Sequence, residues 1–199
     1  VILRKKLIAG EYVNGLGKTL GNFCARTAFR GSDLSLPTKE KKKDTALFQG
    51  NVELMAITEN LIFTEPYFEA EMNHHTEGLE PVINTLRSDV SLKQEVQHML
   101  VKFTSNTETL LHGDLHSGSV MCTDKETKII DPEFGFYGPM GFDIGMLISN
   151  FLMAYFSQPG HRTENTLEEY QNWILSIIEE IYSTFISEFS NLWRNERQG

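Results

Sequence analysis

The sequence predicts an α+β fold that is mostly helical, with a small β-hairpin set in its middle. Two observations lead to this fold class. Apolar residues recur at helical spacing in both halves of the chain, and three short apolar runs bounded by turn-forming residues lie between them, over residues 109–131. Hydrophobic residues make up 40% of the 199 residues, which is enough for the core of one ordinary domain and excludes wholesale disorder.

The first half of the chain is expected to form two helical regions. The charged run at residues 39–43 follows Pro37, so we expect an exposed loop there that leads into a helix. That helix starts at about Asp44, and Pro66 ends it at the latest. A second helical region covers about residues 80–103.

Short strands are expected at the centre of the chain. Residues 109–112, 120–123 and 128–131 fit strands, and a turn at residues 124–126 joins the last two into a hairpin. Antiparallel strands bring the end of the second strand back to the start of the first. We therefore expect residues 131–133 to return close to the loop that leads into the hairpin.

Helices are expected again after the chain-breaking residues at positions 139–141. The apolar run at residues 144–156 predicts a buried helix. Thr166 and Glu169 match a capping box, and residues 170–192 then carry apolar side chains at the helical period, which predicts a long amphipathic helix. We expect these two helices to bury their apolar faces against each other.

The overall charge and the apolar pattern exclude several classes of function. The net charge is −9, so neither a nucleic acid nor an anionic membrane is expected as a partner. The apolar run at residues 144–156 is too short to span a bilayer, and no secretory signal is recognised. Cys24 and Cys122 are far apart and predict no disulfide framework, which favours a reducing, cytoplasmic location.

The residues that point to chemistry flank the predicted hairpin. The loop HGDLHSGS, residues 112–119, precedes it, and the run DPEFG follows it. Asp114, Asp131 and Glu133 are therefore expected to gather, and gathered carboxylates repel one another unless a hard cation such as Mg²⁺ lies among them. Phosphoryl transfer needs Mg²⁺ on the phosphates and a separate Asp that orients the attacking hydroxyl. This pattern predicts Asp114 in the orienting role and Asp131 and Glu133 at the metal.

The two histidines of the loop allow other interpretations. His112 and His116 are four residues apart and would suit Zn²⁺ if they lay on one helix, but Gly113 and Gly118 argue against a helix there. His112 is instead expected to pack under the loop and hold its backbone. Asp143 opens the apolar helix, where it either complements the helix dipole or holds the backbone of the loop from a buried position.

Two further motifs carry less weight. The stretch GLGKT at residues 15–19 is similar to a phosphate-binding loop, but the first glycine of that motif would fall on Tyr12. We expect an ordinary part of a helix there. His74 and His75 lie in a polar stretch and are expected at the surface.

Several runs of the sequence resemble one family. The loop at residues 112–119 followed by DPEFG at residues 131–135 resembles the small-molecule kinases of the aminoglycoside and choline phosphotransferase type, which share the protein-kinase-like fold. Within that group, a resemblance to the S-methyl-5-thioribose kinases extends over nearly the whole chain. Four runs carry it: residues 58–67, 112–119, 131–145 and 192–196.

The resemblance implies that residues 1–199 form the C-terminal, catalytic and substrate-binding lobe of a kinase-like enzyme. Such enzymes need a glycine-rich loop, a phosphate-binding lysine and a hinge for adenine, and none is found before Asp114. The N-terminal ATP-binding lobe is therefore expected to lie outside this chain. The sugar-binding arginine pair of the family is likewise expected after Gly199.

The resemblance also implies a role for each candidate residue. Asp114 is the catalytic base and contacts the sugar. Asp131, Pro132 and Glu133 match the segment that binds ATP, with Mg²⁺ held by the two carboxylates. Asp143 matches the aspartate that supports the catalytic loop.

One position departs from the wider kinase superfamily. An Asn usually stands at the position of Ser119 and serves as a second metal ligand, whereas Ser119 agrees with the thioribose kinases. Because a hydroxyl is a weaker ligand, the metal is expected to depend on Asp131 and Glu133.

The implied activity is the ATP- and Mg²⁺-dependent phosphorylation of the 1-hydroxyl of methylthioribose in methionine salvage, by an enzyme that is a homodimer. This chain alone is expected to be inactive. Two alternatives remain: a related kinase for an amino sugar, choline or homoserine, and a kinase-like module that binds without catalysing.

Overall fold

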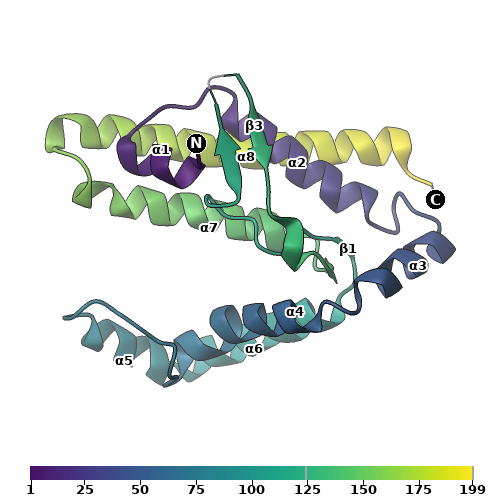
Figure 1. The fold of residues 1–199 in the computed structure, drawn as a ribbon, viewed down its shortest axis with the longest axis horizontal. Coiled ribbons are helices and arrows are strands. Elements are labelled where there is room, and N and C mark those ends of the chain that lie inside the picture. The colour runs from purple at the N-terminus through teal and green to yellow at the C-terminus, as the bar shows by residue number, and fades with distance from the viewer. Residues whose placement is uncertain (124, 199) are drawn as a thin grey trace.

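The chain folds into two groups of helices that lie one above the other, with a small hairpin beside the first group (Figure 1). The computed structural model describes residues 1–123 and 125–198. The first group consists of α1 (Leu3–Ala9), α2 (Leu16–Arg30), α7 (Phe142–Ser157) and α8 (Glu164–Glu196). The second group consists of α4 (Val52–Thr58), α5 (Glu80–Ser88) and α6 (Val90–Ser105), and α3 (Thr38–Phe48) links the two groups.

Two small antiparallel pairs of strands occupy the centre. The predicted hairpin consists of β2 (Val120–Cys122) and β3 (Thr127–Ile129), with Val120 opposite Ile129. A second pair joins β1 (Thr109–Leu110) to β4 (Tyr137–Gly138), a strand that the sequence pattern did not predict. Asp124, in the predicted turn, lies outside the described residues. The prediction of a mostly helical α+β fold with a central hairpin is confirmed.

The main core lies between α2 and α8. Each helix buries one face, made of aliphatic and aromatic residues three or four positions apart. Burying one such side chain contributes roughly 1.5–3 kcal/mol. The predicted contact between α7 and α8 is present, but α2 packs along α8 far more extensively, and the sequence pattern did not identify it as the main partner. The largest completely buried side chains of α2, α7 and α8 are Leu16, Leu20, Phe29, Leu147, Phe151, Tyr170, Ile174 and Ile181.

A smaller aromatic cluster attaches the second group of helices to the centre of the molecule. Phe103 of α6 is buried against Leu111 and Phe136, which flank the β1–β4 pair. Its ring centroid lies 4.8 Å from that of Phe136 and 4.9 Å from that of Phe142 at the start of α7. Aromatic pairs at such distances add to the stability gained from burial. The two groups of helices therefore meet beneath the loop that precedes β2.

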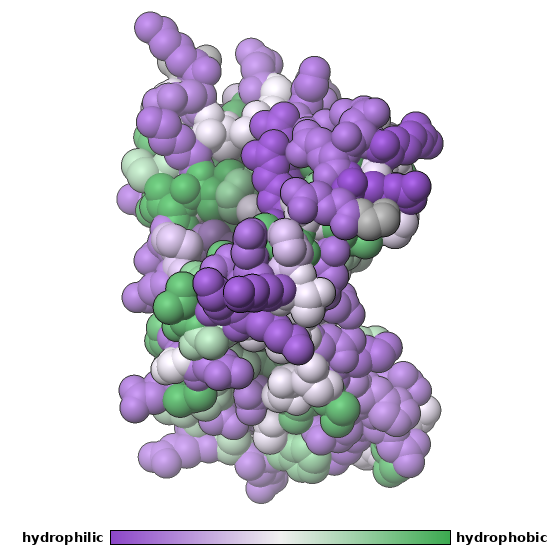
Figure 2. Space-filling view, turned by 90° about the vertical axis from the view of Figure 1, so that its right-hand side faces the viewer, coloured by the Kyte–Doolittle hydropathy of each residue, from purple (hydrophilic) through white to green (hydrophobic). Residues whose placement is uncertain are grey.

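The charged run at residues 39–43 was predicted to be a loop, and this is wrong. It lies inside α3, which begins at Thr38 after Pro37. Four of its five side chains are exposed, as expected, but Lys41 is buried and forms an ion pair with Asp33. Figure 2 shows the face of the molecule on the side of α3, where hydrophilic side chains dominate and hydrophobic ones show mainly along the left side and at the lower end.

The helical region predicted up to Pro66 is divided. The chain leaves the helix between Phe48 and Val52, and α4 then continues into a π-helix, η1 (Glu59–Thr64), and a short 3₁₀ helix, η2 (Glu65–Tyr67). The α-helix and the π-helix therefore end before Pro66, as predicted, and Pro66 itself lies inside η2. π-Helices are rare and short.

Two helix starts differ from the prediction. The region at residues 80–103 is interrupted by Asp89, whose carboxylate accepts a hydrogen bond from the Leu92 N–H at 2.9 Å and caps α6. The long helix α8 begins at Glu164, so Thr166 lies inside its first turn and the predicted capping box is wrong.

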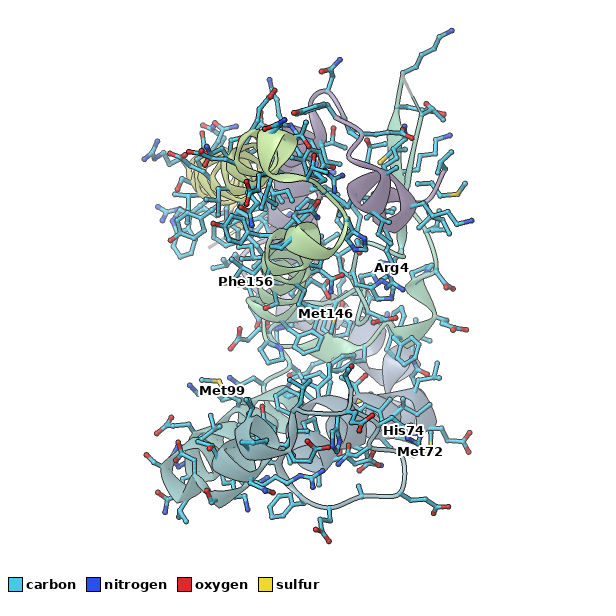
Figure 3. The ribbon with its side chains drawn as sticks, turned by 90° about the vertical axis from the view of Figure 1, so that its left-hand side faces the viewer. Arg4, Met72, His74, Met99, Met146 and Phe156 are labelled. Carbon is cyan, nitrogen blue, oxygen red and sulfur yellow. The ribbon has the colours of Figure 1, made fainter. Side chains whose placement is uncertain are left out.

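Other expectations about individual segments hold. Residues 16–19 belong to α2, so the GLGKT stretch is part of a helix and not a phosphate-binding loop. His74 and His75 are exposed, and Figure 3 shows His74 beside Met72 at the outside of the second group of helices. No helix in the described residues combines the length and the apolar character that a membrane crossing needs.

Two glycine substitutions should have opposite effects on stability, because one glycine lies at the close contact of α2 with α8 and the other is in open space. A Cβ on Gly21 would lie 2.6 Å from the Ile181 carbonyl oxygen, whereas nothing lies within 4 Å of one on Gly145 in α7. Gly21→Ala should lower the free energy of unfolding by about 1–3 kcal/mol through overpacking. Gly145→Ala should raise it by about 0.5–1 kcal/mol through helix propensity. Urea unfolding of both variants tests this, and equal effects would contradict the described helix contact.

Candidate active site

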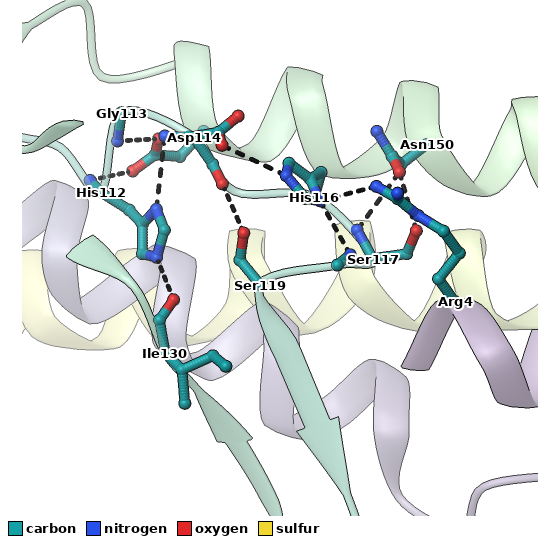
Figure 4. A network of polar contacts seen from close by, with 11 residues as sticks. Arg4, His112, Gly113, Asp114, His116, Ser117, Ser119, Ile130 and Asn150 are labelled. Carbon is teal, nitrogen blue, oxygen red and sulfur yellow. Dashed lines mark hydrogen bonds and ion pairs between the residues drawn. The ribbon is translucent and has the colours of Figure 1, made fainter. Parts of the chain in front are cut away.

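The loop from His112 to Ser119 runs between β1 and β2 and is held by hydrogen bonds from several elements (Figure 4). Most of its residues are buried, but 37% of the Asp114 side chain is exposed to solvent. The carboxylate of Asp114 is therefore accessible to a substrate.

Asp143 fixes the backbone at the start of the loop. Its carboxylate accepts hydrogen bonds from the backbone N–H of His112 at 2.7 Å and of Gly113 at 3.1 Å. Only 3% of Asp143 is exposed, and this burial raises the pKa of its carboxyl, an effect that the two N–H donors oppose. Of the two roles left open by the sequence, the geometry shows the buried one, in which Asp143 holds the loop.

The His112 ring packs against the loop and holds its backbone by hydrogen bonds, as predicted. Its Nδ1 accepts the Asp114 backbone N–H at 3.3 Å, so the hydrogen of the neutral ring lies on Nε2. Nε2 is 2.9 Å from the Ile130 carbonyl oxygen, to which it donates. The ring thus connects the loop to the residue directly before Asp131.

The segment after β3 packs directly against the loop. A Cβ on Gly113 would lie 2.1 Å from the Phe134 carbonyl oxygen, and Gly113 also has a positive φ of 85°. Only glycine fits both conditions. Phe134 ends the 3₁₀ helix η3 (Pro132–Phe134), which follows Asp131. The structure therefore brings the two predicted motifs side by side, as the hairpin geometry implied.

Asn51, at the start of α4, holds this second segment. Its side-chain amide donates to the carbonyl oxygens of Glu133 and Gly135, both at 2.9 Å. Asp131 itself has a φ of 69°, in the left-handed region, where Asp is one of the few tolerated non-glycine residues. The second group of helices thus contributes directly to the backbone around the predicted metal ligands.

The carboxylates of Asp131 and Glu133 are suited to a metal held jointly with phosphate. Both residues are exposed, and within residues 1–123 and 125–198 neither side chain forms a hydrogen bond or ion pair with the protein. Two hard oxygen donors of this kind match Mg²⁺, which commonly takes one or two carboxylates plus phosphates.

The expectation that three carboxylates gather around a metal is not met. In the described part of the chain, no group of three or more His, Cys, Asp or Glu side chains could hold a metal ion. Asp114 instead directs Oδ2 toward His116, 3.2 Å away. Zinc at His112 and His116 is also disfavoured, because both ring nitrogens of His112 and Nδ1 of His116 take part in hydrogen bonds with the protein.

Ser119 has an internal role in this structure. Its side chain is buried, and its hydroxyl donates to the Asp114 carbonyl oxygen at 2.9 Å. The hydroxyl therefore closes the loop around Asp114 rather than facing Asp131 as a ligand would.

Sequence reasoning missed several residues that shape the site. Asn150 of α7 accepts hydrogen bonds from the Ser117 N–H at 3.2 Å and from its hydroxyl at 2.9 Å. Arg4 of α1 reaches His116. The sequence does mark Asn150, because it is a polar residue inside an apolar helix. Nothing in the sequence marks Arg4 or Asn51 as part of the site, because their partners are distant in the sequence.

The match to a family model agrees with this geometry. Residues 13–173 match the phosphotransferase enzyme family. The chain belongs to this family. The matched range contains the whole of the loop at residues 112–119 and of the segment at residues 131–135, and it supports the assignment of the helical fold to the kinase-like class.

Within this family, the chain is similar to curated proteins of one kind. The chain is 48% identical to methylthioribose kinase of Escherichia coli O45:K1 over its full length, and 41% identical to methylthioribose kinase 1 of Oryza sativa subsp. japonica, also over its full length. It is 42% identical to methylthioribose kinase of Geobacillus thermodenitrificans over 98% of its length. The resemblance to the thioribose kinases is therefore confirmed. The chain covers 47–48% of these relatives, so it spans about half their length.

Removing the Asp143 carboxylate should destabilise the protein. Asp143→Ala leaves two buried N–H groups without an acceptor, which should lower the free energy of unfolding by about 2–5 kcal/mol. The matched control is Glu168→Ala, which removes an exposed carboxylate on α8 and should change stability by less than about 0.5 kcal/mol. Urea unfolding measures both, and similar values for the two variants would contradict the bracing role.

Proposed function

We propose that this chain is the catalytic lobe of a methylthioribose kinase. In this proposal ATP donates its γ-phosphoryl group to the 1-hydroxyl of S-methyl-5-thioribose, a reaction of methionine salvage. The observation that carries it is the loop that presents Asp114 beside a segment with two carboxylates, Asp131 and Glu133, that have no partner among the described residues. Similarity to three methylthioribose kinases across at least 98% of the chain supports the choice of acceptor.

Asp114 has the features of a general base. It is partly exposed, and its backbone N–H and C=O are both held, by His112 and Ser119. In the proposed reaction the acceptor hydroxyl gives its proton to Asp114 while its oxygen attacks the γ-phosphorus and ADP leaves. Because the loop is fixed before the substrate arrives, little further ordering is needed to align the carboxylate.

Asp131 and Glu133 are proposed to hold Mg²⁺ together with the phosphates of ATP. Mg²⁺ bound there would neutralise phosphate oxygens. Pro132 lies between the two ligands at the first position of η3, where its fixed φ suits the turn and no backbone N–H is required. The chain contributes the spacing of the two carboxylates, and Asn51 holds the backbone that carries Glu133.

The adenine-binding and phosphate-binding parts are proposed to lie in a further lobe, with residues 1–199 as the C-terminal lobe. A cytoplasmic location is part of the proposal and is supported by two free, buried cysteines, Cys24 and Cys122. Burial raises the pKa of both thiols, so neither is a reactive thiolate. The homodimer stays a prediction from the family resemblance.

Turnover of methylthioribose by the full-length enzyme tests the proposal. Purified protein with Mg-ATP should form the 1-phosphate of methylthioribose, and it should use choline, homoserine and an aminoglycoside at least 100-fold less efficiently. Faster phosphorylation of another acceptor would identify the related-kinase alternative. Absence of transfer to any of the four acceptors would support a non-catalytic module and overturn the proposal.

Substitution of the proposed base should affect turnover and not folding. Asp114→Asn should lower kcat by roughly 10²–10⁴-fold, a usual effect of losing a general base. Its thermal midpoint should stay within a few degrees of the parent value, because the two side chains are nearly isosteric. Asp89→Asn, at the exposed cap of α6, serves as the control and should keep full activity. Near-parental turnover of Asp114→Asn would remove the residue from the mechanism.

Substitution of a proposed metal ligand should change the Mg²⁺ requirement. Glu133→Gln should shift the Mg²⁺ concentration for half-maximal activity upward by about tenfold or more, because one of two carboxylate ligands is lost. Glu126→Gln, on the hairpin, removes an exposed carboxylate that pairs with Lys128 at 3.2 Å and should leave this concentration unchanged. Superimposable Mg²⁺ titrations for the two variants would contradict the assignment.

A further inference from the structure

A line of contacts runs from helix α1 to the carboxylate of Asp114. Arg4 Nη2 lies 3.1 Å from His116 Nδ1, and His116 Nε2 lies 3.2 Å from Asp114 Oδ2. Figure 4 shows the three side chains in sequence along the loop, and Figure 3 shows Arg4 extending from α1. Arg4 and His116 are 112 positions apart, so only the fold brings them together.

The donors around His116 determine which of its nitrogens carries the hydrogen. Nδ1 accepts the backbone N–H of Gly118 at 2.8 Å and also faces the Arg4 guanidinium, which can only donate. Nδ1 is therefore the unprotonated nitrogen. The hydrogen of the neutral ring therefore lies on Nε2, the nitrogen that is 3.2 Å from Asp114 Oδ2.

The surroundings of His116 leave the ring little freedom. A Cβ on Gly118 would lie 2.4 Å from His116 Cε1 and 3.0 Å from Arg4 Nη2, so the ring and the guanidinium fill the space that a side chain there would need. The Arg4 backbone N–H also donates to the Ser117 carbonyl oxygen at 3.0 Å, and Asn150 accepts from Ser117 on its other side. The start of α1 is thus joined to the loop by main chain and side chain together.

We propose that His116, with its tautomer selected by Arg4 and Gly118, is a positioning residue that orients Asp114 for proton transfer. The inference rests on the function proposed above and adds a role that the sequence did not assign to either side chain. His116 occupies Oδ2 of the carboxylate, which leaves Oδ1 to accept the proton of the attacking hydroxyl. Arg4 acts through His116, because its guanidinium lies 3.1 Å from Nδ1 and can only donate there, which favours the tautomer with the hydrogen on Nε2.

Two variants of His116 separate positioning from packing. The amide nitrogen of Gln reaches about as far as Nε2, so His116→Gln can still donate to Asp114. The Asn amide reaches only as far as Nδ1, so His116→Asn cannot. His116→Asn should lower kcat by about 10- to 100-fold, the range for one lost hydrogen bond to a charged group. KM for the acceptor should change less than threefold, and His116→Gln should regain most of kcat.

The control for these variants is His98→Asn, which alters an exposed imidazole on α6 and should leave kcat unchanged. Equal losses of kcat in His116→Asn and His116→Gln would show a packing role and overturn the proposal. A loss that appears only in KM would overturn it as well.

A spectroscopic measurement tests the inference without turnover. In ¹⁵N spectra of the chain, His116 should show an unprotonated Nδ1 and a protonated Nε2 whose hydrogen exchanges slowly with solvent. Asp114→Ala should make that exchange fast, and Arg4→Met should increase the fraction of the other tautomer. A hydrogen on Nδ1 in the parent chain, or exchange unchanged by Asp114→Ala, would overturn the proposal even if methylthioribose is the acceptor. The expected spectrum in a protein that fails to phosphorylate methylthioribose would refute the acceptor and keep the positioning contact.

Discussion

The structure around the site depends on one buried carboxylate that receives two backbone N–H groups. Asp143, at the start of α7, accepts from His112 and Gly113, and this bond pair ties the loop to the helix that packs on α8. Burial of a carboxylate is costly, and the two donors offset that cost only when the loop takes this one conformation. His112, Asp114 and Ser119 all take their places relative to that anchor.

Local patterns in the sequence predicted most of the helices and the β2–β3 hairpin. Helical periodicity and turn residues are local signals, so they identify elements even without knowledge of their partners. The exact bounds of several elements depend on contacts with residues that are distant in the sequence. Lys41 is buried within α3 and pairs with Asp33, and β4 exists because Tyr137 lies opposite Leu110, 27 residues away in the sequence. No local pattern contains that information.

The candidate site likewise contains residues that the sequence identified and residues that only the fold brings to it. Asp114, Asp131 and Glu133 are side chains whose chemistry and spacing are visible in the sequence. The side chains that orient them come from far away: Arg4 from α1, Asn51 from α4 and Asn150 from α7. His116 was visible as a residue, but its role was not, since the direction of an imidazole hydrogen depends on donors that only the folded chain brings to it.

The left-handed backbone at Asp131 limits how this position can change during evolution. Gly accepts that φ most easily, and Asn accepts it about as readily as Asp, whereas a longer or β-branched residue meets steric strain there whatever its charge. Replacing Asp131 by Asn or Gly removes the carboxylate. Replacing it by Glu keeps a carboxylate but strains the left-handed backbone. Each single exchange therefore loses either the ligand or the turn. If the carboxylates of Asp131 and Glu133 hold a metal as proposed, divergence that alters the metal site is expected to proceed through Glu133, whose backbone is helical and accepts most residues.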